Sequence, residues 1–125
     1  MKKLQILLCA AALPAILTCC AAKPAAPTKI TPEEAQKMMS GDVIILDVRT
    51  QDEYDSGHIP NAICLPVDQV AAQAESVLPD KNQTILVYCR SGARAATASQ
   101  TLADMGYTNV YNFGGILSWP GEIIQ

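Results

Sequence analysis

The chain has 125 residues, a formal net charge of −3, five cysteines and one histidine. This length is enough for one small domain with a limited core, and the acidic balance argues against nucleic acid or an anionic membrane surface as a partner. Because there is a single histidine, no Cys/His spacing is typical of a metal site, and we expect no bound metal.

The first residues have the order of an export signal. Lys2 and Lys3 precede an apolar stretch from Leu4 to Leu17, and small residues follow it. Pro14 interrupts the stretch, which is also short of the roughly 20 apolar residues that a membrane span needs. A retained anchor helix is therefore the weaker interpretation.

The segment Leu17-Thr18-Cys19-Cys20 resembles the lipobox of bacterial lipoproteins, in which a cysteine is lipidated and becomes the new N-terminus. Cys20 fits that position, which predicts a signal peptide over residues 1–19 and a membrane-anchored lipoprotein. Cys19 is a less usual neighbour than Gly, Ala or Ser. The alternative is a soluble periplasmic product cut near Ala22, and both interpretations predict export.

Residues 20–28 are rich in Ala and Pro and are predicted to form a tether, which leaves residues 29–125 as one folded domain. Without Lys2 and Lys3, seven basic and twelve acidic residues remain, a net charge near −5. The domain keeps only Cys64 and Cys89, so it is not a disulfide scaffold. The sequence leaves a bridge between them open, although the apolar run around Cys64 favours a small buried side chain.

Local patterns predict helices and strands in alternation. The segment Thr31–Glu34 is typical of a helix start with a capping box, and the apolar run Val43–Val48 predicts a strand covered on both faces. Thr50 and Glu53 repeat the capping-box spacing, which predicts a short helix over Gln51–Ser56.

The second half of the chain continues this alternation. A turn at Gly57–Asn61 leads into a short strand over Ala62–Leu65 and a helix over Val67–Leu78. The next segments predict a strand over Thr84–Tyr88, a helix over Ala93–Met105 and a short strand over Asn109–Asn112. A turn over Phe113–Gly115 and one helical turn over Ile116–Trp119 follow. This order predicts a three-layer α/β domain with a mostly parallel sheet, and ligands outside the carboxyl ends of its strands.

The hexapeptide Cys89-Arg90-Ser91-Gly92-Ala93-Arg94 lies where a buried strand leads into a helix. Backbone N–H groups in such a turn, together with the helix dipole, attract an anion and favour the reactive thiolate. Arg90 and Arg94 are two of the seven cations left after removal of the signal, and their clustering predicts a local anion site. The alternative is an inert buried thiol between solvated arginines.

Four segments, in order and spacing, resemble the rhodanese-like domain family: Asp47-Val48-Arg49, Gly57-His58-Ile59-Pro60-Asn61-Ala62, the hexapeptide and Gly114-Gly115-Ile116-Leu117-Ser118-Trp119. The resemblance covers residues 29–125. It implies the rhodanese fold, a three-layer α/β structure with a central, mostly parallel five-stranded sheet. It also implies a single-domain sulfurtransferase that uses a persulfide on Cys89 and needs no cofactor.

The hexapeptide has the chemistry that sulfur transfer needs. Cys89 is the expected nucleophile, and the N–H groups from Arg90 to Arg94, with Ser91, Gly92 and Ala93 between them, form an expected hole for the negative terminal sulfur. Gly92 lets the backbone curl closely around that sulfur. Arg94 presents a fork to the sulfonate oxygens of a donor such as thiosulfate, and Arg90 guides anions at the rim. Structural roles are expected for Asp47, Arg49, His58, Phe113 and Trp119.

Two other functions stay open. A cysteine phosphatase of the same fold is disfavoured because four residues, not five, separate Cys89 from Arg94, and Tyr88 rather than His precedes the cysteine. A rhodanese-like module that binds without catalysis is the second alternative, against which the retained Cys89 argues. The expected partners are small sulfur-containing anions and a thiol or protein-cysteine acceptor, and we expect a monomer.

Overall fold

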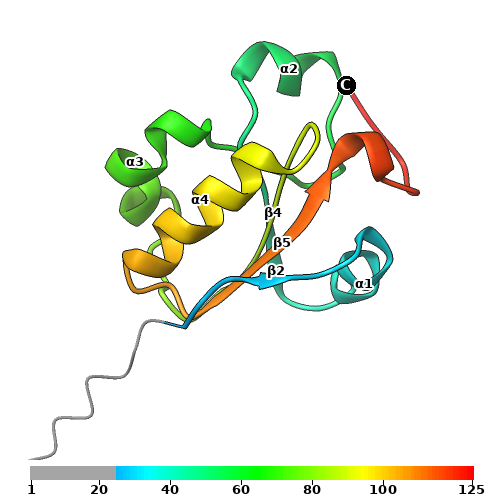
Figure 1. The fold of residues 1–125 in the computed structure, drawn as a ribbon. Helices are drawn as coiled ribbons and strands as arrows, with labels where there is room; N and C mark the ends of the chain where they lie inside the picture. The colour runs from blue at the N-terminus through cyan, green and yellow to red at the C-terminus, as the bar shows by residue number, and fades with distance from the viewer. Residues whose placement is uncertain (1–24) are drawn as a thin grey trace, which may run out of the picture.

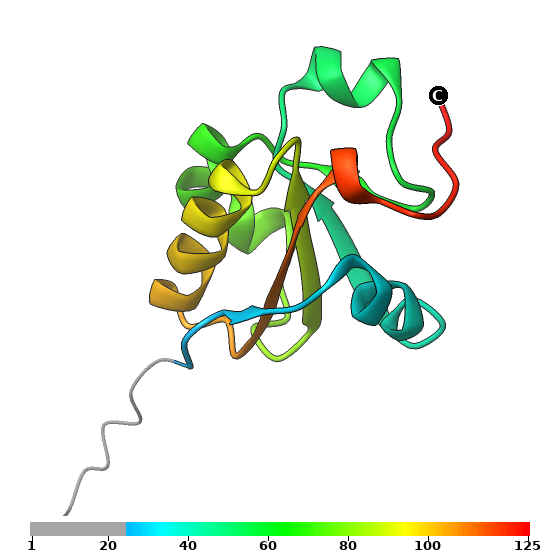
Figure 2. The ribbon, with the colours of Figure 1, turned by 45° about the vertical axis from the view of Figure 1, so that its right-hand side comes forward.

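The computed structural model describes residues 25–125. Its centre is a five-stranded sheet with the strand order β1-β5-β4-β2-β3, in which every neighbouring pair is parallel (Figures 1 and 2). The strands are β1 (Thr28–Lys29), β2 (Val43–Asp47), β3 (Ile63–Cys64), β4 (Thr84–Cys89) and β5 (Asn109–Gly115). This arrangement confirms the predicted α/β fold. The predicted signal peptide, Cys20 and most of the tether lie outside the described residues and stay predictions.

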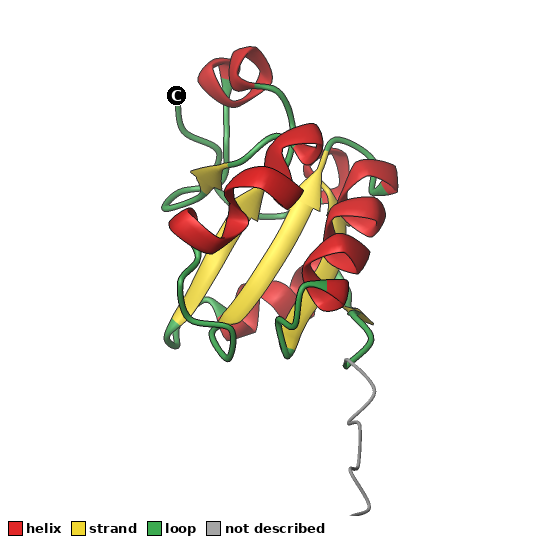
Figure 3. Cartoon of the chain, turned by 90° about the vertical axis from the view of Figure 1, so that its left-hand side faces the viewer, coloured by secondary structure: helices red, strands yellow, loops and turns green. Residues whose placement is uncertain are grey.

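Helices cover both faces of the sheet. Helices α3 (Val70–Val77) and α4 (Ala93–Asp104) lie on one face, and α1 (Pro32–Met38) lies on the other (Figures 1 and 3). Helix α2 (Gln51–Ser56) lies beyond the carboxyl ends of the strands. Two 3₁₀ turns, η1 (Val67–Gln69) and η2 (Ile116–Ser118), complete the elements. None of the helices between residues 25 and 125 is long and apolar enough to span a membrane.

Strand β4 divides its side chains between the two layers. Ile85, Val87 and Cys89 belong to the core under α3 and α4, whereas Leu86 and Tyr88 belong to the core under α1. Successive residues of a strand point to opposite faces. The dipeptide Tyr88-Cys89 therefore directs the thiol toward α4 and the phenol toward the other layer.

Both predicted capping boxes are present. Thr31 and Glu34 exchange side-chain to backbone hydrogen bonds at the start of α1, and Thr50 and Glu53 do the same at the start of α2. Each box satisfies backbone donors that the first helical turn leaves without acceptors. These two helices therefore begin at the residues that the sequence indicates.

Several boundaries differ from the sequence expectations. Thr28, assigned to the tether, pairs with Tyr111 in β1, a two-residue strand that no apolar run marks because the edge of β5 alone orders it. The helix predicted over Val67–Leu78 starts as the 3₁₀ turn η1 before α3. Strand β5 continues to Gly115, so the turn predicted at Phe113–Gly115 is wrong.

The extension of β5 follows from close backbone packing. A Cβ atom at Gly115 would overlap the Arg90 carbonyl group. A pair of glycines usually marks a turn, but glycine inside a strand also marks a place where another backbone approaches closely. Here the approaching backbone is the start of the hexapeptide.

A buried polar network joins β2, β4 and the turn after α2. The fully buried Asp47 carboxylate accepts hydrogen bonds from Arg49 Nη2 at 2.6 Å, Arg49 Nε at 3.0 Å and Tyr88 Oη at 2.8 Å. Arg49 Nη2 also donates to the Gly57 carbonyl oxygen at 2.7 Å, and the Ile59 N–H donates to Tyr88 Oη at 3.1 Å. Every charge in this network thus has partners, as a buried ion pair requires.

Helices α2 and α4 are joined by a bidentate ion pair. Arg94 Nη1 lies 2.7 Å from Glu53 Oε1, and Arg94 Nη2 lies 3.0 Å from Glu53 Oε2. The hydrogen bonds from Arg94, supported by those from Thr50, lower the pKa of Glu53 to about 2. The Glu53 carboxylate therefore both caps α2 and holds α4.

Removal of the Tyr88 hydroxyl should destabilise the fold. Tyr88→Phe leaves Asp47 and the Ile59 N–H each short of a hydrogen-bond partner in the core, which costs about 1–3 kcal/mol. Chemical denaturation measures this loss. Tyr111→Phe is the matched control, because no hydrogen bond of the Tyr111 hydroxyl occurs among the described residues, and it should change the free energy of unfolding by less than about 0.5 kcal/mol. Equal losses in the two variants would contradict the role given to Tyr88.

The Glu53–Arg94 pair should contribute a pH-dependent part of the stability. Because the folded state lowers the pKa of Glu53 from 4.5 to about 2, the contribution is complete above the unfolded value and is lost as the pH falls through the folded value. Both side chains are partly exposed, so solvent screening limits the loss in Glu53→Gln at pH 7 to about 1 kcal/mol.

The measurement is the difference in the free energy of unfolding between wild type and Glu53→Gln at pH 7 and at pH 3, where the difference should shrink. Glu34→Gln is the control, because Glu34 occupies the same capping-box position in α1 and forms no ion pair among residues 25–125. A difference that is constant with pH would contradict the assignment.

Candidate active site

The cysteine at the end of β4 lies inside the turn that the hexapeptide forms. Cys89 is 1% exposed, and its Sγ accepts a hydrogen bond from the Gly92 N–H at 3.0 Å. Gly92 has a φ of 114°, a left-handed conformation that side chains other than glycine rarely adopt. Gly92 therefore brings the chain back over the sulfur and aims a backbone donor at it.

Helix α4 begins directly after this glycine. The first N–H groups of an α-helix have no acceptor within the helix, so those of Ala93 and Arg94 are available to an anion. The twelve-residue helix adds the positive end of its dipole at the same place. These features match the anion-binding turn that the sequence predicts for the hexapeptide.

The turn is fixed against the end of β5. Cys89 pairs with Gly115 across a local irregularity in the β4–β5 register. The Leu117 N–H donates to the Arg90 carbonyl oxygen at 3.3 Å, and a Cβ atom at Gly92 would lie 3.4 Å from Gly114 Cα. Backbone contacts to β5 and η2 thus hold the hexapeptide in place.

The two arginines of the hexapeptide differ in their surroundings. Arg90 is exposed, and its side chain has no ion-pair partner among the described residues. The Arg94 guanidinium is partly exposed and is bound by Glu53. The pKa of Arg94 is raised above its ordinary value, first by its hydrogen bonds to Glu53 and in smaller part by the charges of Cys89 and Asp47. Arg94 therefore lies within electrostatic reach of the Cys89 sulfur.

The second cysteine lies apart from this turn. Cys64 ends β3 at the far edge of the sheet, with β2 between it and β4. Both cysteines are free, so the bridge that the sequence left open is absent. Burial, followed by the charge of Asp47, raises the pKa of the Cys64 thiol, which disfavours its thiolate. Between residues 25 and 125, no three His, Cys, Asp or Glu side chains gather as metal ligands would.

The other residues of the family motifs make structural contacts. The His58 ring stacks on Tyr54 with centroids 3.7 Å apart, and its Nδ1 lies 2.9 Å from the Tyr54 carbonyl oxygen. The Phe113 ring packs between Tyr88 and Trp119, with centroids 5.4 and 5.6 Å away. Asp47 and Arg49 bind each other in the buried network.

The sequence does not indicate that two residues near the site belong to it. The sequence pattern predicts only a capping box for Glu53, and nothing local indicates that the same carboxylate also holds Arg94 across 41 positions. Tyr88 lies in a run that predicts an apolar strand, although its hydroxyl binds Asp47. A polar tip at a fully buried strand position is the one sequence signal for such a bond, because a buried hydroxyl needs a partner.

Comparisons with known proteins agree on one family. The family model described as the rhodanese-like domain matches residues 31–122. Thiosulfate sulfurtransferase PspE of Escherichia coli is 39% identical over 71 residues, which are 57% of this chain and 68% of that protein. Thiosulfate sulfurtransferase GlpE of Coxiella burnetii is 37% identical over 82 residues, 65% of this chain and 75% of that protein.

Solved structures give the same result. A structure described as a rhodanese with anions from E. coli has a TM-score of 0.62 and 34% identity, and the match covers 66% of this chain and 96% of that one. A rhodanese-related protein from Thermoplasma volcanium has a TM-score of 0.69 and 26% identity, with coverage of 78% and 97%. The chain therefore belongs to the rhodanese-like domain family and is an enzyme of the rhodanese type.

Proposed function

We propose that the protein is a thiosulfate sulfurtransferase that works through a persulfide on Cys89. The observation that carries this proposal is the hydrogen bond from the Gly92 N–H to the Cys89 sulfur, at the start of α4. A donor aimed at the sulfur and the positive end of a helix dipole both stabilise a thiolate. The names of the E. coli and Coxiella relatives support thiosulfate as the donor.

The proposed cycle has two displacement steps. The Cys89 thiolate attacks the outer, sulfane sulfur of thiosulfate, a bond forms between the two sulfurs, and sulfite leaves with the electron pair of the broken S–S bond. The persulfide then carries its negative charge on the terminal sulfur. A thiophilic acceptor attacks that sulfur and releases the Cys89 thiolate. Cyanide serves as the acceptor in vitro and gives thiocyanate.

The first turn of α4 is suited to the charge in both steps. The N–H groups of Gly92, Ala93 and Arg94 are fixed before the reaction, so they stabilise a negative sulfur without reorganisation. The fork that the sequence predicts is occupied, because Glu53 binds both Nη1 and Nη2 of Arg94, so Arg94 offers the donor its positive charge and its remaining N–H groups. Arg94 lies two residues after Gly92, whose N–H binds the Cys89 sulfur, and this place in the same turn supports the role.

Phosphate ester hydrolysis is the disfavoured alternative. Four residues separate Cys89 from Arg94, so the turn encloses a smaller space than a five-residue loop would, and one sulfur fits it better than a tetrahedral phosphate. We expect negligible turnover of a generic aryl phosphate. A binding module without catalysis is the other alternative, and the Cys89 variant below distinguishes it.

Cys89→Ser should abolish sulfur transfer. A hydroxyl is a far weaker nucleophile than a thiolate, so the thiosulfate:cyanide activity should fall roughly a thousandfold or more. Intact mass after incubation with thiosulfate should show one added sulfur, about 32 Da, in the wild type but not in Cys89→Ser. Cys64→Ser is the matched control and should keep both the activity and the added mass. Equal background rates in wild type and Cys89→Ser would favour the binding module.

Arg94→Lys should distinguish the effect of the planar guanidinium on activity from the effect of its positive charge. Lysine keeps the charge but loses the bidentate contact to Glu53 that orients the guanidinium, so kcat/KM for thiosulfate should fall roughly tenfold. Arg90→Lys is the control at the exposed rim, where charge alone acts, and it should stay within about twofold of wild type. Steady-state kinetics with cyanide as the acceptor measure both. Wild-type kinetics in Arg94→Lys would show that the planar guanidinium is not needed for sulfur transfer.

A further inference from the structure

The Glu53 carboxylate occupies the end of Arg94 with which an arginine binds an oxyanion. Helix α2, which carries Glu53, lies near the start of α4, which carries Arg94 (Figures 1 and 2). Arg94 Nη1 donates to Glu53 Oε1 at 2.7 Å, and Arg94 Nη2 donates to Glu53 Oε2 at 3.0 Å. Arginine forms the same pair of parallel hydrogen bonds with other oxyanions, such as phosphate groups. The two terminal nitrogens of Arg94 therefore already hold a carboxylate of the protein itself.

The contact to Arg94 is not needed for the capping box of α2. Glu34 closes the same kind of box at the start of α1 and forms no ion pair with any residue between 25 and 125. Glu53 closes its box and also binds Arg94. The ion pair is thus an additional feature, and Arg94 belongs to the turn that surrounds the nucleophile.

Glu53 also removes side-chain charge from the site. The charges of the buried network cancel each other, and Glu53 compensates Arg94. Arg90, exposed at the rim, is the cation of the hexapeptide without an ion-pair partner in the part of the chain that the structure describes. Backbone N–H groups are therefore the main partners of an anion at the Cys89 sulfur. An anion on the remaining N–H groups of Arg94 lies beside a like charge, which weakens its binding.

The site has to distinguish two anions of similar shape and equal charge. Sulfate is thiosulfate with an oxygen in place of the sulfane sulfur, so it offers the Cys89 thiolate no S–S bond to break and can only block the site. All of its affinity comes from charge and hydrogen bonds, for which an arginine with free terminal nitrogens is a strong partner. Thiosulfate depends in addition on the placement of its sulfane sulfur at Cys89 Sγ and on contacts that strengthen as sulfite leaves.

We propose that Glu53 is a specificity-determining residue of the sulfur-transfer site. Its carboxylate excludes sulfate and other inert tetrahedral oxyanions from the terminal nitrogens of Arg94. It also holds the guanidinium in the orientation in which the remaining N–H groups serve the departing sulfite. This inference rests on the proposed sulfurtransferase function. Glu53 acts through Arg94 and not on the reacting atoms, so it is a positioning residue.

The exclusion does not depend on pH in the range where the protein is folded and active. Hydrogen bonds from Arg94, supported by those from Thr50, lower the pKa of Glu53 to about 2, so the carboxylate stays charged in neutral and mildly acidic solution. Sulfate is a dianion over the same range. The repulsion between the two is therefore a constant property of the site.

The test measures two constants in Glu53→Gln at fixed pH and ionic strength: kcat/KM for thiosulfate with cyanide as the acceptor, and the inhibition constant of sodium sulfate. Glutamine closes a capping box as glutamate does, but its NH₂ group cannot accept from Arg94, so the guanidinium loses a partner and its charge is uncompensated. The loss of orientation should lower kcat/KM about three- to tenfold. Sulfate should inhibit about three- to tenfold more tightly.

The opposite directions of these changes distinguish the proposal from a structural role, because a loosened site would bind both anions less well. Asp52→Asn is the matched control. Asp52 precedes Glu53 in α2, and its side chain forms no hydrogen bond or ion pair among the described residues. The same change in net charge should therefore leave both constants within about twofold of wild type.

Protection of the thiol provides a measurement that needs no turnover. Iodoacetamide, a neutral reagent, alkylates the Cys89 thiolate, and sulfate bound in the turn should slow this reaction. Sulfate should protect Cys89 at about three- to tenfold lower concentration in Glu53→Gln than in wild type. Peptide mass spectra measure the alkylated fraction at this cysteine.

The other outcomes overturn the inference. Unchanged or weaker inhibition by sulfate in Glu53→Gln, or equal protection of Cys89 in the two proteins, would contradict the exclusion of oxyanions. Unchanged kcat/KM would show that Glu53 does not position Arg94. Equal effects in Asp52→Asn would assign the result to net charge alone. Absence of cyanide turnover and of the persulfide mass in the wild type itself would refute the sulfurtransferase function, and this inference with it.

Discussion

The buried Asp47 carboxylate is the interaction on which the carboxyl edge of the sheet depends. It lies without solvent contact at the end of β2, where an unpartnered charge would be strongly unfavourable, and Arg49 and Tyr88 supply its hydrogen bonds. Through these two residues the network reaches the Gly57 carbonyl and the Ile59 amide. Tyr88 directly precedes Cys89, so the same network fixes the end of β4 that carries the Cys89 thiol.

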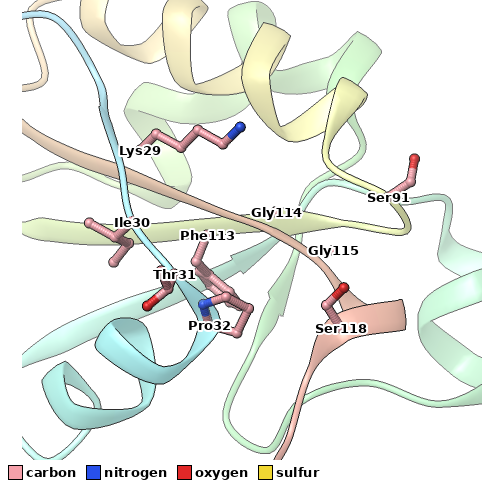
Figure 4. Close-up of a pocket in the computed structure, with 9 residues that line it drawn as sticks. All are labelled: Lys29, Ile30, Thr31, Pro32, Ser91, Phe113, Gly114, Gly115 and Ser118. Atoms are coloured by element: carbon pink, nitrogen blue, oxygen red, sulfur yellow. The ribbon is translucent and has the colours of Figure 1, made fainter.

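Two glycines, Gly92 and Gly115, determine how closely the backbone packs around the hexapeptide. Gly115 lets β5 approach the Arg90 carbonyl more closely than any side chain would allow, and Gly92 reverses the chain so that its amide reaches the Cys89 sulfur. Such close contacts leave little freedom to the hexapeptide, which is the condition for a preorganised anion site. Beyond the departure of β1, the end of β5 that has no β1 partner borders a cleft of about 310 Å³ (Figure 4).

Glu53 connects the two sides. As the third residue of α2 it closes a capping box, and as the partner of Arg94 it holds the start of α4. The capping box and the ion pair share one carboxylate. Hydrogen bonds from both Arg94 and Thr50 lower the pKa of Glu53, so each interaction favours the charged carboxylate that the other one uses. The orientation of Arg94 is thus linked to the formation of a short helix beyond the sheet.

The sequence by itself determined the family, the α/β order of elements and both capping boxes, because these features depend on neighbours a few residues apart. Cys89, Gly92 and Arg94 lie within six consecutive residues, so their proximity was evident before the structure. Only the tertiary structure decided the strand β1, the length of β5, the Glu53–Arg94 pair and the bond from Tyr88 to Asp47. The physical reason is separation along the chain: the two side-chain contacts each join residues 41 positions apart, and Thr28 becomes a strand only where the edge of β5 gives it a partner.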